Sequence, residues 1–134
     1  MPSRNVQTVK QANAALNAGE FDALADVFAP DCIFQDLQNA PDQQPAVEGA
    51  EAIRETLTLW ASAFDELRAD ISEYLELGDT VLCAARWHGE GKASGISIDT
   101  HQFDLYTLRD GKVVRAIIGF KSKHDALEAA AAEN

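Results

Sequence analysis

The second half of the chain carries four apolar, strand-like runs that are joined by short turns. These runs cover residues 67–77, 80–88, 96–108 and 112–120. Gly78-Asp79 and Arg109-Asp110-Gly111 are typical of the turns that close hairpins. Strands that follow one another through hairpins pair antiparallel. This half of the chain therefore predicts an antiparallel sheet.

The first half of the chain predicts helices with a single strand among them. Ser3 provides an N-cap for a first helix, and Gly19 ends it. A second, short helix stops before Ala29-Pro30, because the residue before a proline disfavours helical geometry. Residues 32–37 read as a strand. Residues 38–48 are a polar loop, either a plain surface excursion or the rim of a pocket.

The clearest element is a helix that ends near residue 64. Its apolar residues Ile53, Leu57, Trp60 and Phe64 follow an i, i+4, i+7, i+11 spacing and form one continuous face. Such a stripe is usually core, although Trp60 can also line a cavity. Residues 124–133 predict an alanine-rich terminal helix.

The order of these elements predicts one α+β domain that spans residues 1–134. Long, twisted strands do not lie flat, so we expect the sheet to curve around the third helix. The expected architecture is a cone-shaped α+β barrel, a curved and mostly antiparallel sheet wrapped around the N-terminal helices with an internal pocket.

Composition excludes several classes of partner. The chain has a formal net charge of −11, whereas nucleic-acid binding needs clustered Lys and Arg. The same charge disfavours an anionic membrane surface, and no segment has the length of a membrane span. The N-terminus lacks the apolar region of a secretion signal. We therefore expect a soluble, cytoplasmic protein that binds neither nucleic acid nor membrane.

No metal or cofactor is expected from the residue spacing. Cys32 and Cys83 lie in apolar runs without the spacing of a metal site, so buried free thiols are the expectation. The histidines show no paired spacing either. His88 stands at a strand end, where it can reach a pocket or an interface.

Two aspartates lie inside strand-like runs, where this residue is depleted. They are Asp36, in the run 32–37, and Asp104, in the run 102–107. A carboxylate is almost never fully buried unless it is paired or neutralised. Either these side chains face water, or the chain tolerates them for chemistry. Strand alternation places Phe34 on the same face as Asp36, and it places Gln102, Asp104 and Tyr106 on one face.

Four short motifs occur in an order that resembles the nuclear transport factor two-like superfamily. They are ALNAGEFD at residues 15–22, FAPD at 28–31, EGAEAIR at 48–54 and RDGKVV at 109–114. The resemblance covers nearly the whole chain, and its SnoaL-like polyketide cyclase and ketosteroid isomerase branches are the most similar. It implies a cone with a deep pocket and a homodimer.

The same resemblance implies roles for both aspartates. Ketosteroid isomerases carry their catalytic base at the position of Asp36 and an oxyanion-hole acid at the position of Asp104, allowing one deletion in the following turn. In a shared apolar pocket, one carboxyl can stay ionised as a base while the other stays protonated as a donor. The tyrosine that these isomerases carry in the first helix is replaced by Ala12. Tyr106 can substitute for it from another direction.

The implied function is a cofactor-independent isomerase or cyclase that abstracts a proton next to a carbonyl. A hydrolytic variant would use an aspartate to activate water. The alternative is a non-catalytic ligand-binding or dimerisation module of the same fold. The ligand is expected to be a small apolar or carbonyl-containing compound. The expected pocket residues are Phe34, Trp60, Phe64, Trp87, His88, Tyr106 and Phe120.

Overall fold

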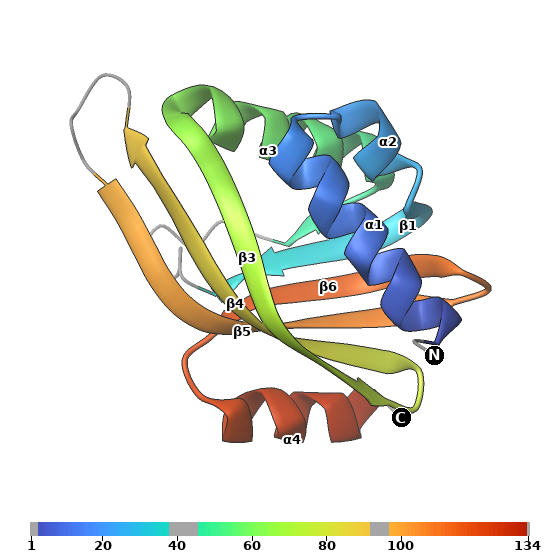
Figure 1. Ribbon diagram of the computed structural model, residues 1–134. Helices are drawn as coiled ribbons and strands as arrows, with labels where there is room; N and C mark the ends of the chain where they lie inside the picture. Colours follow the sequence, from blue (N-terminus) through green and yellow to red (C-terminus); the bar gives the residue numbers. More distant parts are fainter. Residues whose placement is uncertain (1–2, 38–45, 92–96, 134) are drawn as a thin grey trace.

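The computed structural model describes residues 3–37, 46–91 and 97–133. Within these ranges the chain forms four helices and six strands (Figure 1). In chain order they are α1 (Arg4–Ala18), α2 (Phe21–Ala25), β1 (Phe28–Asp36), β2 (Val47–Glu48), α3 (Ala50–Ala63), β3 (Phe64–Leu77), β4 (Thr80–Gly91), β5 (Ser97–Arg109), β6 (Lys112–Phe120) and α4 (Lys123–Glu133).

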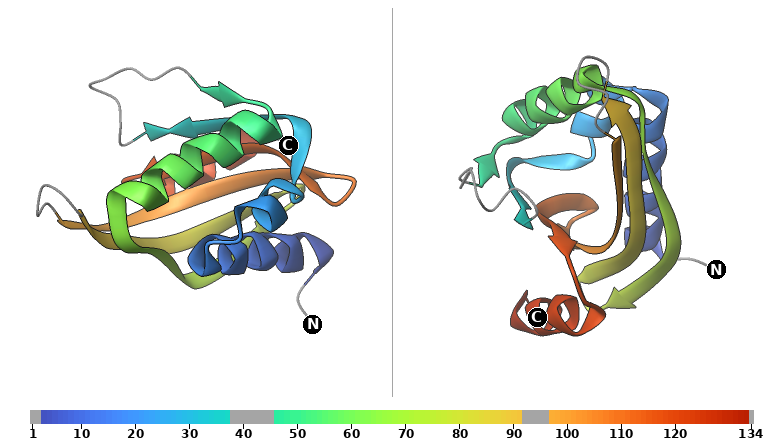
Figure 2. Two further views of the ribbon diagram at one scale, coloured as in Figure 1. Left: turned by 90° about the horizontal axis from the view of Figure 1, so that it is seen from above. Right: turned by 90° about the vertical axis from the view of Figure 1, so that its left-hand side faces the viewer.

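The six strands form one sheet in the order β2-β1-β6-β5-β4-β3. The contact between β1 and β6 is parallel, and the other four contacts are antiparallel. The long strands bend as they cross the molecule, so that the sheet curves around the N-terminal helices (Figure 2). The predicted α+β class and the curved, mostly antiparallel sheet are therefore confirmed.

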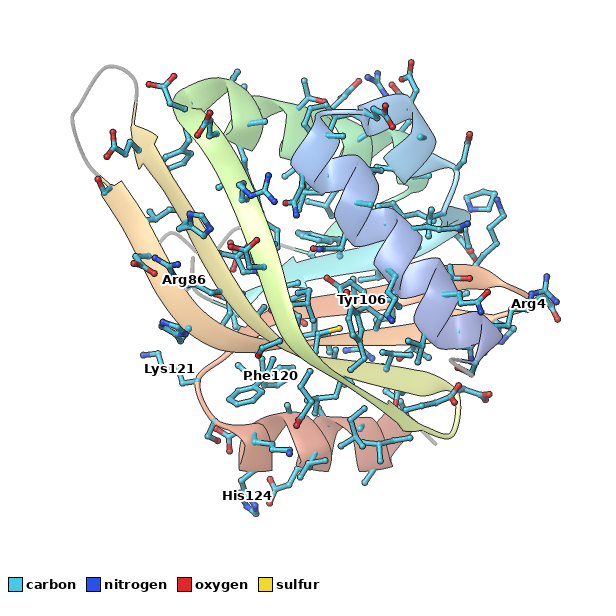
Figure 3. The ribbon with its side chains drawn as sticks, viewed as in Figure 1. Arg4, Arg86, Tyr106, Phe120, Lys121 and His124 are labelled. Carbon is cyan, nitrogen blue, oxygen red and sulfur yellow. The ribbon has the colours of Figure 1, made fainter. Side chains whose placement is uncertain are left out.

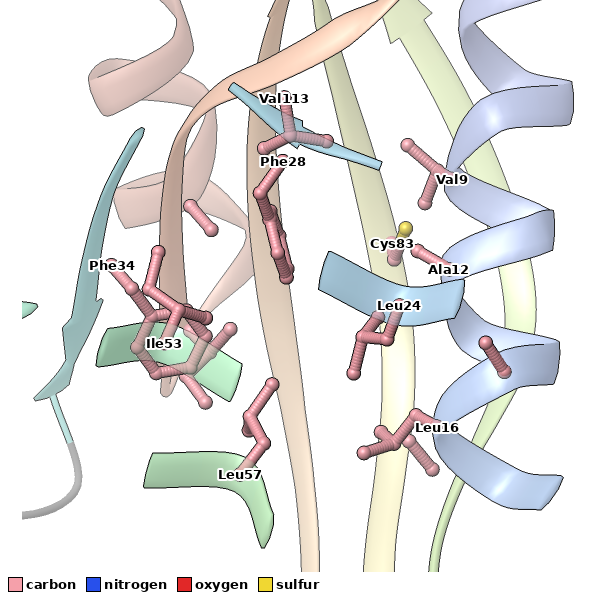
Figure 4. Packing of buried hydrophobic residues seen from close by; sticks show 14 of the residues in the cluster. Val9, Ala12, Leu16, Leu24, Phe28, Phe34, Ile53, Leu57, Cys83 and Val113 are labelled. Carbon is pink, nitrogen blue, oxygen red and sulfur yellow. The ribbon is translucent and has the colours of Figure 1, made fainter. Parts of the chain in front are cut away.

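The helices cover the two faces of the sheet unequally. The apolar residues of α1, α2 and α3 pack into one large core cluster with the concave face, as Figure 4 shows for Leu16, Leu24 and Ile53. Helix α4 lies on the opposite face, where Ala126 and Ala130 pack against a smaller cluster (Figure 1). The concave face is therefore the face that can enclose an internal cavity, because it curves around the helices that cover it.

The start and end of α1 agree with the sequence prediction. The backbone N–H of Val6 donates to the Ser3 hydroxyl over 3.1 Å, which satisfies one of the free donors of the first turn. Gly19 ends the helix in the left-handed conformation, with φ of 73°. In the described part of the chain no helix combines the length and apolar character needed to cross a bilayer.

Two sequence predictions about the first strands were wrong. The second helix was expected to continue through Phe28, but Phe28 begins β1 and pairs with Val113 of β6. Its ring is buried in the main core, and this burial favours the strand over continued helix. Val47 and Glu48 were assigned to a loop, but they pair with β1 as the short strand β2. Residues 38–45 of that predicted loop lie outside the described residues.

Asn17 connects α1 to the edge strand β3. Its Nδ2 donates to the carbonyl of Ala69 over 2.9 Å, and its Oδ1 accepts from the N–H of Ala69 over 2.8 Å. We expect Asn17→Ala to lower the free energy of unfolding by about 1–3 kcal/mol, because both backbone groups of Ala69 lose their partner. The test is urea denaturation of Asn17→Ala and of a control, Gln11→Ala, at an exposed position of the same helix. Equal stability of the two variants would refute a structural role for Asn17.

Candidate functional site

A cavity of about 400 Å³ lies between α3 and the concave face of the sheet. Six of the nine described residues that line it are apolar, and three are polar. The lining residues are Asp36, Trp60, Phe64, Leu67, Trp87, Ile98, Thr100, Gln102 and Ile118. Because few polar groups converge in an otherwise apolar pocket, this cavity is the candidate binding site.

Four of the sequence-predicted site residues reach this cavity, namely Asp36, Trp60, Phe64 and Trp87. Asp36 stands at the end of β1, opposite Ile118 of the parallel strand β6. Its side chain is partly buried and shares its face of the strand with Phe34. The cavity therefore carries a carboxylate on a mainly apolar wall.

Phe34 and Tyr106 lie in the main core and are not among the residues that line the cavity. Phe34 is buried, and its ring meets the ring of Trp60 edge to face at a centroid distance of 5.8 Å. Tyr106 is partly buried in the main core (Figure 3). Burial raises the pKa of its phenol well above the usual value, and the charge of Asp104 raises it further. Tyr106 is therefore a neutral phenol at physiological pH.

His88 and Phe120 do not lie at the cavity, contrary to the sequence expectation. His88 follows Trp87 along β4 and so faces the other side of the sheet, where its Nε2 lies 2.7 Å from Oδ2 of Asp70. Phe120 packs in the cluster under α4 (Figure 3). A β-bulge at Gly119 shifts the alternation of β6, which turns Phe120 away from the cavity.

The bulge at Gly119 also forms part of the environment of Asp104. The register of β5 against β6 shifts so that two residues, Ile118 and Gly119, lie opposite Asp104. Gly119 has a φ of 97°, which a residue without a side chain adopts readily. Its N–H donates to Oδ1 of Asp104 over 3.0 Å. The backbone irregularity thus supplies a donor to a carboxylate inside the sheet.

Asp104 is fully buried and accepts two further hydrogen bonds. The indole Nε1 of Trp87 donates to Oδ2 over 2.8 Å, and the amide Nε2 of Gln102 donates to Oδ1 over 2.7 Å. Burial raises its pKa from 3.8 to about 6; the three hydrogen bonds oppose the shift and the charge of Asp36 adds to it. Asp104 is therefore mainly ionised at neutral pH.

This geometry differs from the donor role that the sequence suggested for Asp104. In all three hydrogen bonds that the structure gives the carboxylate of Asp104, a neighbouring N–H group is the donor. Asp104 therefore acts as an acceptor that orients its neighbours. It lies beneath the lining, whereas Trp87 and Gln102 form part of it. Gln102 thus lines the cavity while its amide nitrogen is bonded to Asp104.

The sequence reasoning missed five lining residues. Ile98, Thr100 and Gln102 share the strand parity of Asp104, so the alternation of β5 was a signal that could have identified all three. Leu67 and Ile118 carry no such signal, since an apolar strand residue at a cavity resembles any other core residue. Their role depends on which strands face α3.

Both cysteines are free and buried, as the sequence predicted. Burial raises the pKa of Cys32 to about 12, and it raises that of Cys83 even more. Both thiols are therefore protonated and poor nucleophiles. Among the described residues, no three His, Cys, Asp or Glu side chains converge as metal ligands would.

Comparison with known families identifies the chain. The family model of the SnoaL-like domain matches residues 9–116. That match covers most of the sequence, so the chain belongs to the SnoaL-like family. A search of curated proteins gave no match.

Solved structures with the same fold cover nearly the whole chain. An NTF2-like protein of unknown function from Burkholderia pseudomallei has 16% identity and a TM-score of 0.78, over 95% of this chain and 97% of that chain. A hypothetical protein with a ketosteroid isomerase-like fold from Catenulispora acidiphila, in complex with trimethylamine, has 18% identity and a TM-score of 0.74, over 92% of each chain. A Mycobacterium tuberculosis protein in complex with estradiol-17beta-hemisuccinate has 14% identity and a TM-score of 0.75, over 87% of this chain and 93% of that chain. At these identities the similarity establishes the fold alone.

Proposed function

We propose that this SnoaL-like chain binds a small, largely apolar carbonyl compound in the cavity and acts on it as a cofactor-independent isomerase or cyclase. Asp36 is the proposed general base. The observation that carries the proposal is the carboxylate of Asp36 on a wall formed mainly by Trp60, Phe64 and other apolar side chains. An apolar surrounding favours the neutral acid over the carboxylate and so strengthens a carboxylate as a base.

The proposed reaction begins when the Asp36 carboxylate takes a proton from the carbon next to the ligand carbonyl. The electron pair of the broken C–H bond moves into the carbonyl and forms an enolate. Isomerisation follows when Asp36 returns the proton to a different carbon. Ring closure follows instead when the enolate carbon attacks a second carbonyl of the same ligand. The π electron pair of that carbonyl moves to its oxygen, and the alkoxide takes the proton that Asp36 holds. The hydroxyl of Thr100, which also lines the cavity, is the proposed donor to the enolate oxygen.

Two of the structural neighbours support a small-molecule pocket. One is a complex with trimethylamine, and the other is a complex with estradiol-17beta-hemisuccinate. The cavity of about 400 Å³ lies within the size range of small-molecule sites.

The proposed base is tested with 3-cyclohexen-1-one, whose conversion to the conjugated ketone is followed by ultraviolet absorbance. We expect the wild type to catalyse the conversion and Asp36→Asn to lower kcat/KM by about 100-fold or more, because the amide cannot accept the proton. Asp31→Asn is the matched control, since Asp31 is exposed on the same strand and its replacement changes the net charge equally. Unchanged turnover in Asp36→Asn, with both variants folded by circular dichroism, would refute the base.

The second candidate function is ligand binding without catalysis. One observation in its favour is that both oxygens of Asp104 already accept hydrogen bonds from the protein. The other is Ala12, which is buried on α1 at the position expected for a tyrosine donor. Thr100 is then the main side-chain donor that the described lining offers to an enolate oxygen. This function predicts binding detected by tryptophan fluorescence, with no product formed from the ketone.

We also propose a homodimer and a cytoplasmic location. The resemblance to the superfamily supports the first, and the two free, buried cysteines support the second, because a reducing compartment keeps thiols free. Sedimentation equilibrium should give twice the chain mass of 14.5 kDa. A mass equal to one chain at micromolar concentration would contradict the dimer.

A further inference from the structure

Among the described residues, the charged groups at and directly beneath the cavity are carboxylates. Asp36 is the one charged side chain among its nine described lining residues, and Asp104 lies directly beneath the lining. These two carboxylates stand on strands that are separated only by β6, which corresponds to a backbone distance of about 10 Å. Their effects add in a site with apolar walls, where screening by water is weak. An anionic ligand is therefore repelled, and a cationic ligand is attracted.

The uncharged polar groups of the cavity favour the same sign of charge. The indole N–H of Trp87 would be a natural donor to a ligand, but it donates to Asp104 instead. Gln102 also directs its amide N–H to Asp104. Both donors are thus directed to Asp104, and the lining still carries the carboxylate of Asp36 and the hydroxyl of Thr100.

Three aromatic residues complete this environment. Trp60, Phe64 and Trp87 contribute rings to the lining from α3, β3 and β4. The face of an aromatic ring attracts a cation, most strongly for tryptophan, and more so when water is excluded.

We propose that the cavity selects a small organic cation, namely a protonated or quaternary amine, which lies between the aromatic rings of Trp60 and Trp87 and the carboxylate of Asp36. The inference rests on the cavity of the proposed function and adds the charge of its ligand. A carbonyl compound that also carries an amine meets both requirements. In such a ligand the ammonium group also offsets the negative charge that develops on the enolate.

The test compares choline with 3,3-dimethyl-1-butanol, which has the same shape but carries carbon in place of the charged nitrogen. Binding is followed by intrinsic fluorescence, because the two tryptophans of the chain both line the cavity, and by isothermal titration calorimetry. We expect choline to bind at least tenfold more tightly than the alcohol, with an affinity that falls as salt is added.

Substitutions test whether the preference for choline arises in the cavity. We expect Asp36→Asn to reduce the preference for choline to near one. Asp31→Asn should leave the preference unchanged, because Asp31 lies on the exposed part of β1. Equal affinity for the two probes, absence of choline binding at millimolar concentration, or a preference that persists in Asp36→Asn would each overturn the inference.

Failure of this inference can be separated from failure of the proposed function. Wild type that converts 3-cyclohexen-1-one but does not prefer choline refutes the cation site and retains the base. Wild type that prefers choline but never converts the ketone refutes the base and retains the cation site.

Discussion

Between about pH 4 and pH 7, the wild type is expected to lose about 2 kcal/mol of unfolding free energy relative to Asp104→Asn. The pKa of Asp104 is about 6 in the folded protein against 3.8 for an ordinary aspartate. Within this interval the folded state therefore binds the proton more tightly than the unfolded state does. Raising the pH then favours unfolding, so the stabilising contribution of the protonated carboxyl is present at low pH and lost at neutral pH.

The measurement is urea denaturation of both proteins at several pH values, followed by far-ultraviolet circular dichroism. The difference between the two unfolding free energies isolates Asp104, because the other carboxylates are common to both proteins. Asp31→Asn, which removes an exposed carboxylate, measures the background that any lost charge produces. A difference that stays flat or grows with pH would show that the three hydrogen bonds outweigh burial, contrary to our interpretation.

The second large effect is expected for Ile53→Ala. Ile53 is 0% exposed, and it packs beside Phe34 under α3 (Figure 4). We expect a loss of about 2–5 kcal/mol in unfolding free energy, because the shortened side chain leaves a cavity that the core fills only in part. Helix α3 also carries Trp60, so we expect the variant to bind cavity ligands more weakly.

Leu59→Ala is the matched control, because Leu59 lies on the same helix and is 70% exposed. We expect it to change the unfolding free energy by less than about 0.5 kcal/mol. Thermal and urea denaturation of both variants measure the contrast. Similar losses for the two variants would show that the apolar stripe of α3 does not anchor the helix to the sheet.

Much of the secondary structure was predictable because it depends on local chemistry. The cap at Ser3, the left-handed end at Gly19 and the apolar spacing of residues 53–64 each act within a few residues of one another. The boundary at Phe28 was not predictable in this way. The strand begins there because Phe28 pairs with Val113, a residue more than eighty positions away.

The candidate site was predictable only in part, for a similar reason. Simple alternation along a strand identifies the face that Asp104 and Gln102 share. It cannot identify the bulge at Gly119, which redirects Phe120 and brings a backbone donor to Asp104. Nor can it indicate that the carboxylate of Asp104 is engaged by Trp87.

The sequence by itself determined the element order, the apolar faces and the two aspartates in strands, because these follow from residue type and spacing. The tertiary structure decided what the aspartates do. Curvature and strand order leave Asp36 at the cavity wall and place Asp104 beneath it, among donors from β4, β5 and β6. Burial and hydrogen-bond partners are set by strands that are distant in sequence, and these are what separate a carboxylate that faces a ligand from one that orients its neighbours.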